Sequence, residues 1–559
     1  MKVKKILLGN EAIVQGALEA GVQFVSAYPG TPSSEVGMVF GKIAKKHGVY
    51  FEFSTNEKVA VEAGIGACFS GLKTLVAMKS FGLNVASDAF LPFVYTGTKG
   101  PFVLLVADDP SCHSSGQSEQ NTRAYGELAH VPILEPADPK EAKEFVKLGF
   151  KISEKFNIPV ILRTTTRVAH QRMPVEIETV NSKQRTVNGR FVKNPKRFVT
   201  MPPRVLEMKD ELLEKIEKVR EYAEKSEVNR CPSSPGGRGR ASTDFGIITS
   251  GVSYLYVKEV LQELKLNIPV LKIGMFYPLA VKKVKDFIKG KNKVLVVEEL
   301  EGYLEKDVRA LAKEVNCPPA GRAGKLKIYG KDLLPISREL GVEKVGRAIA
   351  KLANKKYLVS KRKEIDIPKR FPRLCEGCPY WLVFSALKKL APKTTIWGGD
   401  IGCYMLAGFE PHEIQDYLLC MGASIGVSHG IRKSTKQKVV ALIGDSTFFH
   451  AGIPALINIV YNNSNPLIVV MDNRITAMTG HQPNPGMGQT GMGEACPEIQ
   501  IKDIVKAVGV KHVKVVDPIN FKELQETIKE YLDKKEAAVI IMKRICTYYA
   551  KKLKKYAKK

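Results

Sequence analysis

Two short polar segments, each directly after an apolar, strand-like run, constrain this chain more than any other feature. They are Gly444-Asp445-Ser446 and Met471-Asp472-Asn473, and the residues between them from 451 to 462 have helical character. This order predicts a βαβ unit whose two parallel strands end side by side. Asp445 and Asn473 would then direct two oxygen ligands at one point. Because open parallel sheets bind ligands at that edge, the pattern predicts a site for Mg²⁺ and a diphosphate.

The same residues also fit two ordinary strand-ending turns, and the Gly-Asp pair alone favours that alternative. The spacing and the second half favour the site, with thiamine diphosphate as its ligand. Thiamine needs a second half that offers a carboxylate to its aminopyrimidine ring and so promotes loss of the C2 proton. Glu57 is the candidate, because it opens a Gly/Ala-rich helix (57–70) after the strand 50–53. The alternative is a first-turn acid favoured by the helix dipole.

The order of strand-like and helix-like segments predicts several α/β domains with largely parallel sheets. The chain has 559 residues, too many for one core. The alternation runs through 1–180, 243–355 and 368–559. Between the first two, the connector 181–242 holds a charged helix and a Pro/Ser/Gly/Arg stretch from 231 to 242, predicted to be a linker. A charged connector, 361–369, precedes the last domain.

Composition indicates a globular protein with a strongly basic surface. The chain is 44% hydrophobic and 26% charged. Because no apolar run reaches the length of a membrane span and the piece after Met1-Lys2-Val3-Lys4-Lys5 is too short for a signal peptide, we expect a cytoplasmic protein without membrane association. Nucleic-acid binding and the solvated surface of a thermophile's protein are two explanations of the net charge of +29. Since no nucleic-acid motif accompanies the charge, acidic protein partners such as a small electron carrier or a complementary subunit are favoured.

Six of the ten cysteines lie in the last third of the chain, which in a cytosolic protein indicates metal binding. Cys375 and Cys378 form a C-x-x-C pair, and Cys403 follows a Gly-rich turn after a strand. A fourth thiolate would complete a [4Fe–4S] site. A structural Zn²⁺ site, a redox dithiol or no role at all are the alternatives.

Several motifs together carry a resemblance to a known family. They are Leu7-Leu8-Gly9-Asn10-Glu11-Ala12, Ala27-Tyr28-Pro29-Gly30-Thr31-Pro32-Ser33-Ser34-Glu35, Lys79 with Gly82-Leu83-Asn84-Val85-Ala86, Asp108-Asp109-Pro110, His113-Ser114-Ser115, Glu119-Gln120, Gly444 to Gly452, and Asp472 to Gln482. With them the chain resembles, over nearly its whole length, the large (alpha) subunit of archaeal-type indolepyruvate:ferredoxin oxidoreductase, within the 2-oxoacid:ferredoxin oxidoreductases.

The resemblance implies a multidomain α/β fold. A pyrimidine-binding-type thiamine diphosphate domain would span 1–180, a transketolase-C-terminal-like domain 243–355, and a diphosphate- and Mg²⁺-binding domain 368–559. It also implies residue roles. Glu57 would activate the cofactor, and Thr31 would lie near the substrate carboxylate. The Mg²⁺ ligands would be Asp445, Asn473 and the Ile475 carbonyl, with Gly444, Ser446 and Gly480 in cofactor binding. The four cluster ligands would be Cys375, Cys378, Cys403 and Cys546, leaving Cys420 and Cys496 incidental.

The implied activity is oxidative decarboxylation of a 2-oxoacid, indolepyruvate or another aryl pyruvate, with coenzyme A capturing the acyl group and ferredoxin taking the electrons. The implied partner is a small (beta) subunit, in a heterodimer or a dimer of heterodimers. One alternative is a non-redox thiamine diphosphate-dependent decarboxylase or synthase, which would lack iron. Another is a binding protein for acidic partners or nucleic acid, which would lack both cofactors.

The sequence departs from the family pattern at two places. Family members usually carry a C-terminal ferredoxin-like domain, whereas this sequence stops at a Lys-rich tail soon after Cys546. Electrons are therefore expected to leave through one cluster, directly or through a separate ferredoxin-like subunit. The family's Cys-Pro-His-Arg reads Cys378-Pro379-Tyr380-Trp381 here, a change that bears on aryl-pyruvate specificity.

Overall fold

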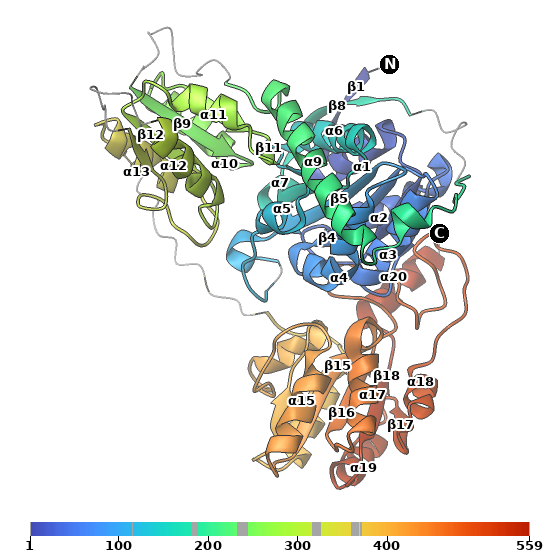
Figure 1. Ribbon diagram of the computed structural model, residues 1–559. Coiled ribbons are helices and arrows are strands. Elements are labelled where there is room, and N and C mark those ends of the chain that lie inside the picture. Colours follow the sequence, from blue (N-terminus) through green and yellow to red (C-terminus); the bar gives the residue numbers. More distant parts are fainter. Residues whose placement is uncertain are drawn as a thin grey trace. The chain divides into compact units, whose positions relative to one another are not determined.

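The computed structural model describes residues 2–114, 116–180, 188–231, 244–315, 326–358, 368 and 372–557. Two compact units result: unit 1 consists of Met1–Glu52 and Glu57–Lys363, and unit 2 of Phe53–Asn56 and Glu364–Lys559. Ser115 of the His-Ser-Ser motif, most of the linker stretch 231–242, the connector 361–369 apart from Pro368, and the last two lysines lie outside the described residues. Figure 1 follows the chain through both units.

The first sheet of unit 1 is the predicted largely parallel one. Its strand order is β11-β6-β7-β5-β4-β2-β3, and β11 is its antiparallel member. Its central strands are buried on both faces, as expected when helices cover both sides. The strands are β2 (Phe24–Ala27), β3 (Tyr50–Phe53), β4 (Thr74–Lys79), β5 (Phe102–Asp108), β6 (Ile133–Leu134), β7 (Val160–Thr165) and β11 (Met275–Tyr277).

Helices on the two faces of this sheet pack in pairs, α1 with α6 and α3 with α4. The predicted helices at 10–20, 57–70 and 207–225 are present as α1, α3 and α9. The helices are α1 (Gly9–Glu19), α2 (Ser34–Ile43), α3 (Glu57–Phe69), α4 (Ser80–Thr96), α5 (Ala124–Ala129), α6 (Pro139–Phe156), α7 (Thr166–His170), α8 (Pro195–Phe198) and α9 (Arg204–Lys225). The basic N-terminal segment forms β1 (Lys2–Leu8), which pairs antiparallel with β8 (Arg172–Glu178).

The second sheet of unit 1 is parallel throughout, in the order β10-β9-β12-β13. Helices α10 and α13 pack together on its core, and α11 packs with α12. The elements are β9 (Phe245–Ser250), α10 (Ser253–Glu263), β10 (Val270–Ile273), α11 (Val281–Ile288), β12 (Lys293–Val297), α12 (Tyr303–Val315), β13 (Lys327–Tyr329) and α13 (Val342–Leu352). Because β11 leaves this region to join the first sheet, unit 1 is continuous, and the predicted boundaries at 180, 242 and 355 stay predictions.

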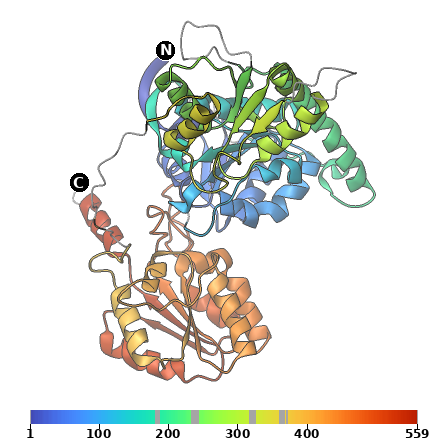
Figure 2. The ribbon, with the colours of Figure 1, turned by 90° about the vertical axis from the view of Figure 1, so that its left-hand side faces the viewer.

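Unit 2 contains a five-stranded parallel sheet in the order β14-β15-β16-β18-β17, with helices on both faces (Figure 2). The predicted βαβ unit is confirmed, because β15 and β16 are parallel neighbours connected through α17. The elements are α14 (Tyr380–Leu390), β14 (Ile396–Gly398), α15 (Ala423–Ser434), β15 (Val439–Gly444), α16 (Asp445–Thr447), α17 (Ile453–Tyr461), β16 (Leu467–Asp472), α18 (Ile501–Ala507), β17 (His512–Val516), α19 (Phe521–Leu532), β18 (Ala538–Lys543) and α20 (Thr547–Ala557).

A buried network of ion pairs joins the two sheets of unit 1. The Arg123 guanidinium bonds to both oxygens of Glu135, at 2.6 and 2.8 Å, and to Glu298 at 3.3 Å. Arg163 on β7 bonds to Asp108 at 2.7 Å and to Glu135 at 3.0 Å. Buried charges are tolerated when they are paired and hydrogen-bonded in this way. The network therefore fixes the ends of β5 and β7, where the functional loops begin, against the second sheet.

Replacing Glu299, beside this network, with glutamine is expected to flatten the pH dependence of stability. Burial raises the pKa of Glu299 from 4.5 to about 7. The folded state thus binds this proton more tightly than the unfolded state, so stability falls as pH rises from about 4.5 through about 7, by on the order of 3 kcal/mol. The neutral amide of the variant can still accept the hydrogen bond that the Leu340 N–H donates to Glu299 at 3.0 Å.

Urea unfolding of E299Q and the parent protein at about pH 5 and about pH 8 measures this difference. The exposed neighbour Glu301 provides the matched control variant, Glu301→Gln. Equal losses of stability in E299Q and the parent over this range would contradict the prediction.

Candidate functional site

Motif residues from three loops meet at the carboxyl ends of β3, β4 and β5 in unit 1. Lys79 ends β4, Glu57 opens α3 after β3, and Asp109 follows β5. Burial lowers the pKa of Lys79, while the Glu57 and Asp109 carboxylates act in the opposite direction. A Cβ at Gly30, in the Tyr-Pro-Gly-Thr-Pro turn after β2, would lie 2.9 Å from the Lys79 Cγ. The structure therefore brings these sequence motifs together at one sheet edge, where open parallel sheets bind ligands.

The Glu57 side chain is enclosed rather than solvated. It is 3% exposed. A Cβ at Gly82, in the first turn of α4, would lie 2.6 Å from its Cγ and 2.8 Å from its Oε1, so Gly82 leaves the space that the carboxyl group occupies. A carboxylate held this closely, with the Lys79 ammonium nearby, has a fixed position from which to bond a ligand.

The turn that holds Thr31 is fixed by hydrogen bonds from its flanks. The Asn10 Nδ2 donates to the Pro32 carbonyl and to Glu35 Oε2, both at 2.7 Å. The Ser33 Oγ donates to the Gly30 carbonyl at 2.8 Å. Thr31 itself is half-buried at the apex. Its role toward a substrate carboxylate stays a prediction.

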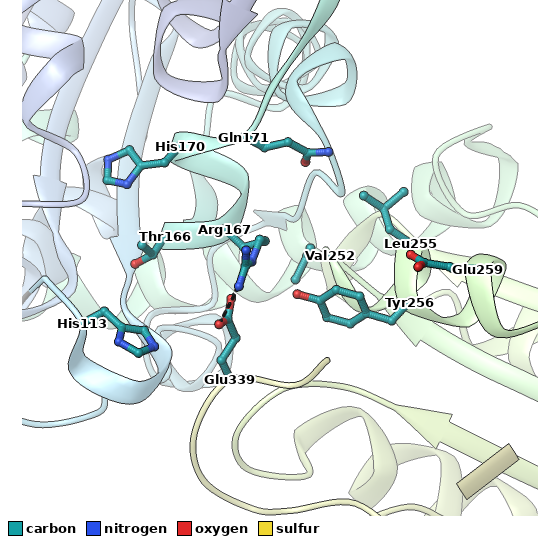
Figure 3. A pocket seen from close by; sticks show the side chains of 10 residues that line it. All are labelled: His113, Thr166, Arg167, His170, Gln171, Val252, Leu255, Tyr256, Glu259 and Glu339. Carbon is teal, nitrogen blue, oxygen red and sulfur yellow. Dashed lines mark hydrogen bonds and ion pairs between the residues drawn. The ribbon is translucent and has the colours of Figure 1, made fainter. Parts of the chain in front are cut away.

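A cavity of about 540 Å³ lies between the two sheets of unit 1, beside α7 and α10 (Figure 3). Arg167 and Glu339 face each other across it and form two parallel bonds, of 2.8 and 2.9 Å. His170, on the same short helix as Arg167, lies 3.4 Å from Glu35, and this interaction raises the pKa of His170. Because Glu35 also binds Asn10, the cavity wall connects to the turn that contains Thr31. Sequence reasoning singled out only His113 among the lining residues.

In unit 2, the ends of β15 and β16 carry the predicted diphosphate half-site. Gly444 is the register partner of Met471, so Asp445 and Asp472 follow at neighbouring positions. Asp445 is 3% exposed, and its oxygens accept hydrogen bonds from the Asn484 Nδ2 at 3.0 Å and the Ser446 N–H at 2.8 Å. Burial raises the pKa of Asp445, and the Asp472 carboxylate raises it further. A cation would relieve both effects, which is the environment a Mg²⁺ ligand needs.

The remaining predicted residues of this half-site lie in the loop after β16. The Asn473 Oδ1 accepts the Ile475 N–H at 3.0 Å, and the Ser446 and Thr476 hydroxyls share a hydrogen bond of 2.8 Å. Gly480 has a φ of 121°, a backbone conformation that favours glycine. The structure thus gathers Gly444, Asp445, Ser446, Asn473 and Ile475 at one strand end and places Gly480 in the turn beyond.

Three neighbours of this half-site were missed by sequence reasoning as site residues. Asp472 was interpreted as part of a motif only, although the pairing of the two strands places it beside Asp445. Thr476 and Asn484 reach the site through side-chain contacts with Ser446 and Asp445. Asn484 sits between two prolines, and that local pattern gives no signal of a contact with a residue 39 positions earlier.

The four predicted cluster cysteines come from three separate segments of unit 2. Cys375 and Cys378 precede α14, Cys403 follows β14, and Cys546 follows β18. Burial raises the pKa of Cys403 to about 12, with further contributions from Cys378, Cys546 and Cys375. Burial likewise raises the pKa of Cys378 to about 11, with contributions from Cys375 and Cys546. Cys403 and Cys378 therefore both lie within electrostatic range of Cys375 and Cys546.

Backbone contacts hold the Cys546 segment between the C-x-x-C turn and the loop after β16. The Cys546 N–H donates to the Asn473 carbonyl at 3.1 Å, and its Sγ lies 3.8 Å from His481 Nε2. The Thr547 Oγ1 donates to the Gly377 carbonyl at 2.8 Å. The Cys546 segment thus contacts the loop that carries part of the diphosphate half-site. Cys420 is an exposed residue whose thiol is only partly buried; this partial burial and Asp400 raise its pKa, and no other cysteine contributes.

The two aromatic residues that replace the family's His-Arg pair lie at the start of α14. Tyr380 is buried and its hydroxyl donates to the Met471 carbonyl at 2.9 Å, at the end of β16. The Trp381 ring packs against His412, with 4.8 Å between ring centroids. Tyr380 therefore supports the end of β16, where the half-site lies.

Among the described residues, no set of three or more His, Cys, Asp or Glu side chains is positioned to hold one metal ion. The predicted Mg²⁺ ligands include one carboxylate, one amide and one carbonyl.

The described helices include none with the length and apolar character needed to cross a membrane.

Comparison with known proteins agrees with this arrangement. Residues 15–230 match the family "Pyruvate flavodoxin/ferredoxin oxidoreductase, thiamine diP-bdg". Residues 237–361 match "Indolepyruvate oxidoreductase domain", and residues 400–542 match "Thiamine pyrophosphate enzyme, C-terminal TPP binding domain". The two residue ranges that match thiamine-binding families contain the two sheet edges described above. The fold and the matches define a thiamine diphosphate-dependent oxidoreductase.

Curated relatives narrow this class to one family. "Indolepyruvate oxidoreductase subunit IorA" of Methanothermobacter thermautotrophicus is 44% identical over 97% of this chain and 87% of its own length. The subunit of the same name from Thermococcus kodakarensis is 44% identical over 97% of this chain and 86% of its own. The chain belongs to the indolepyruvate oxidoreductase subunit IorA family. A solved 2-oxoglutarate:ferredoxin oxidoreductase from Magnetococcus marinus, with 2-oxoglutarate, coenzyme A and succinyl-CoA bound, overlaps 62% of this chain and 65% of its own, at 18% identity and a TM-score of 0.48.

Proposed function

We propose that this chain is the large subunit of an enzyme that oxidatively decarboxylates a 2-oxoacid, indolepyruvate or another aryl pyruvate. With coenzyme A, the reaction gives acyl-CoA, CO₂ and reduced ferredoxin. The observation that carries the proposal is the grouping of cysteine thiols from three segments beside the loop after β16, which also carries part of the diphosphate half-site. A non-redox thiamine enzyme needs the half-site but has no use for those thiols.

Each of the two sheet edges, taken by itself, carries residues of the kind that thiamine diphosphate needs. When bound, it stabilises the carbanion that decarboxylation produces. Asp445, Asn473 and the Ile475 carbonyl would hold the Mg²⁺ that binds its diphosphate, and the raised pKa of Asp445 supports a cation there. Glu57 would bond the aminopyrimidine ring, and its enclosure by Gly82 supports a positioned carboxylate.

A [4Fe–4S] cluster fits the thiols of Cys375, Cys378, Cys403 and Cys546. All four belong to the described residues, and thiolates are the usual ligands of such a cluster. A cluster binds each thiolate through a different iron, so its ligands stand further apart than the ligands of a single metal ion. Cys378, Cys546 and Cys375 all contribute to the raised pKa of Cys403, which supports thiols close enough to bind one group. Thr31 would lie near the substrate carboxylate.

The proposed enzyme works with partners. The relatives' subunit name supports a second, small (beta) subunit, in a heterodimer or a dimer of heterodimers. Ferredoxin, the 2-oxoacid and coenzyme A complete the set, and neither nucleic acid nor a membrane is a partner. The proposed location is the cytoplasm.

Substrate-dependent loss of visible absorbance tests the proposal in protein purified without oxygen and co-expressed with its small subunit. Indolepyruvate, phenylpyruvate and pyruvate are added in turn, each with coenzyme A. Bleaching by an aryl pyruvate supports cofactor, cluster and substrate class together. A brown protein that no 2-oxoacid bleaches would remove the substrate assignment. A colourless, iron-free protein would instead favour the non-redox thiamine enzyme.

A further inference from the structure

The last helix, α20, is strongly basic and begins directly after Cys546. Residues 547–559 contain six lysines and no acidic residue. Lys551, Lys552 and Lys554 are exposed. Such a one-sided charge attracts an acidic surface over distances of about a Debye length, roughly 10 Å at moderate salt. A solvated surface without a partner would need no such concentration at one place in unit 2.

Apolar side chains lie among these lysines. Ile545, Tyr548 and Leu553 are 38%, 50% and 45% exposed. The Lys551 ammonium lies 5.6 Å from the centre of the Tyr548 ring. We call Ile545, Tyr548, Lys551, Lys552, Leu553 and Lys554 the α20 surface. Exposed apolar groups interspersed with charges of one sign fit a protein interface that combines apolar and charged contacts.

The start of α20 is fixed relative to the cysteine thiols. Thr547 bonds to the Gly377 carbonyl inside the C-x-x-C turn, and the Tyr549 ring stacks on His481, which itself lies beside Cys546. A helix rises about 1.5 Å per residue, so Lys551 to Lys554 lie roughly 7–12 Å along the axis from Cys546. Figure 2 shows α20 at the margin of unit 2, next to the C-terminal end. A protein bound to the α20 surface would therefore be held close to the thiols.

We infer that the α20 surface docks an acidic electron-carrier protein and holds its redox centre near the Cys546 thiol. The inference rests on the proposed function, since it requires a cluster at the four cysteines. One electron passes to the carrier at each encounter, so the two electrons released per 2-oxoacid require two carriers in turn. Charge complementarity selects the carrier, because a small ferredoxin-type protein with an acidic surface meets both the lysines and the need for close approach.

The test is charge reversal in the complete two-subunit enzyme. K551E/K552E/K554E is expected to raise the KM for a small acidic ferredoxin by about 10-fold or more at low ionic strength, because steering by charge changes association rates by about 10–10³. Turnover with benzyl viologen, a cationic small-molecule acceptor, should stay within about twofold of the parent. Raising the ionic strength should raise the ferredoxin KM of the parent and leave that of the variant nearly unchanged.

K436E/K529E/K535E is the matched control. These lysines are exposed, and Lys535 precedes β18 whereas Cys546 follows it. The six residues of β18 separate the two ends by about 20 Å. An equal rise in ferredoxin KM in both triple variants, or no rise in either, would overturn the docking surface. Normal viologen turnover in the same experiment would leave the proposed function standing. Binding of anionic vesicles or RNA to α20 with an unchanged ferredoxin KM would also overturn it. A parent enzyme that contains no iron and shows no turnover with viologen would overturn the proposed function and the docking together.

Discussion

Glu57→Gln is expected to lower 2-oxoacid turnover by about 10²–10⁴-fold, the range that a positioned proton-transfer group contributes. Glutamine has nearly the shape of Glu57 and fills the same space beside Gly82. It cannot exchange a proton with the aminopyrimidine ring, so the cofactor would bind yet lose its proton at C2 slowly. Binding of thiamine diphosphate should change little, because the diphosphate half-site lies in residues that the substitution leaves intact.

Two measurements separate this role from a structural one. Hydrogen–deuterium exchange at the thiamine C2, followed by NMR, should slow in parallel with turnover, while titration of the apoenzyme gives the cofactor affinity. Glu62→Gln is the control, because Glu62 lies on the same helix, is exposed and pairs with Lys58 at 3.7 Å. If E57Q and E62Q exchanged deuterium at the same rate, Glu57 would be a first-turn helix acid and no more.

Gly82→Ala provides a second approach to the same residue. The added methyl would lie 2.6 Å from the Glu57 Cγ, so the carboxyl group must move. We expect a loss of turnover of about 10²-fold, since a displacement of about 1 Å can cost that much. Tight cofactor binding with normal turnover in G82A would show that the position of Glu57 is not critical.

The parallel sheets and the two strand ends were predictable because each rests on a local pattern. Apolar runs followed by Gly, Asp or Asn mark strands buried on both faces and their carboxyl ends. Gly444-Asp445 and Asp472-Asn473 are such ends, and the register of β15 and β16 confirms that they are neighbours. Glu57 at the start of α3 follows from the same reasoning, because the Gly/Ala-rich helix indicates close packing.

Features that depend on distant contacts were not predictable. The short strand β11 joins a sheet built by residues more than 100 positions earlier. A strand of three residues is too short for its periodicity to indicate which sheet it joins. Asn484 reaches Asp445 from a loop, and Arg167 meets Glu339 across the cavity only after both sheets have folded. Cys546 was assigned from family resemblance, since no second C-x-x-C pair marks it. Its nearness to the Cys378 and Cys403 thiols results from the tertiary structure.

Replacing Cys546 with serine is expected to abolish ferredoxin reduction while decarboxylation continues. A hard serine oxygen is a poor ligand for iron that prefers thiolate. Ferredoxin reduction should fall by more than the factor of about 10–100 that a metal site loses when a residue bonded to one of its ligands is removed. In the proposed enzyme, removal of CO₂ from the 2-oxoacid would need Glu57 and the diphosphate half-site, and neither includes this thiol. We therefore expect C546S to be pale, to contain less iron, and to release an aldehyde instead of acyl-CoA.

Cys420→Ser and Cys496→Ser are the controls, since neither thiol contributes to the raised pKa values of Cys378 and Cys403. Iron content, visible absorbance, CO₂ release and the ratio of aldehyde to acyl-CoA are measured for all three variants. A colour change in C420S or C496S with none in C546S would move the fourth ligand to another cysteine. Full ferredoxin reduction by C546S would instead show that the thiols are not a route for electrons. The ratio of products carries the argument further than colour does, because it changes only if the cysteine group directs the reaction toward oxidation.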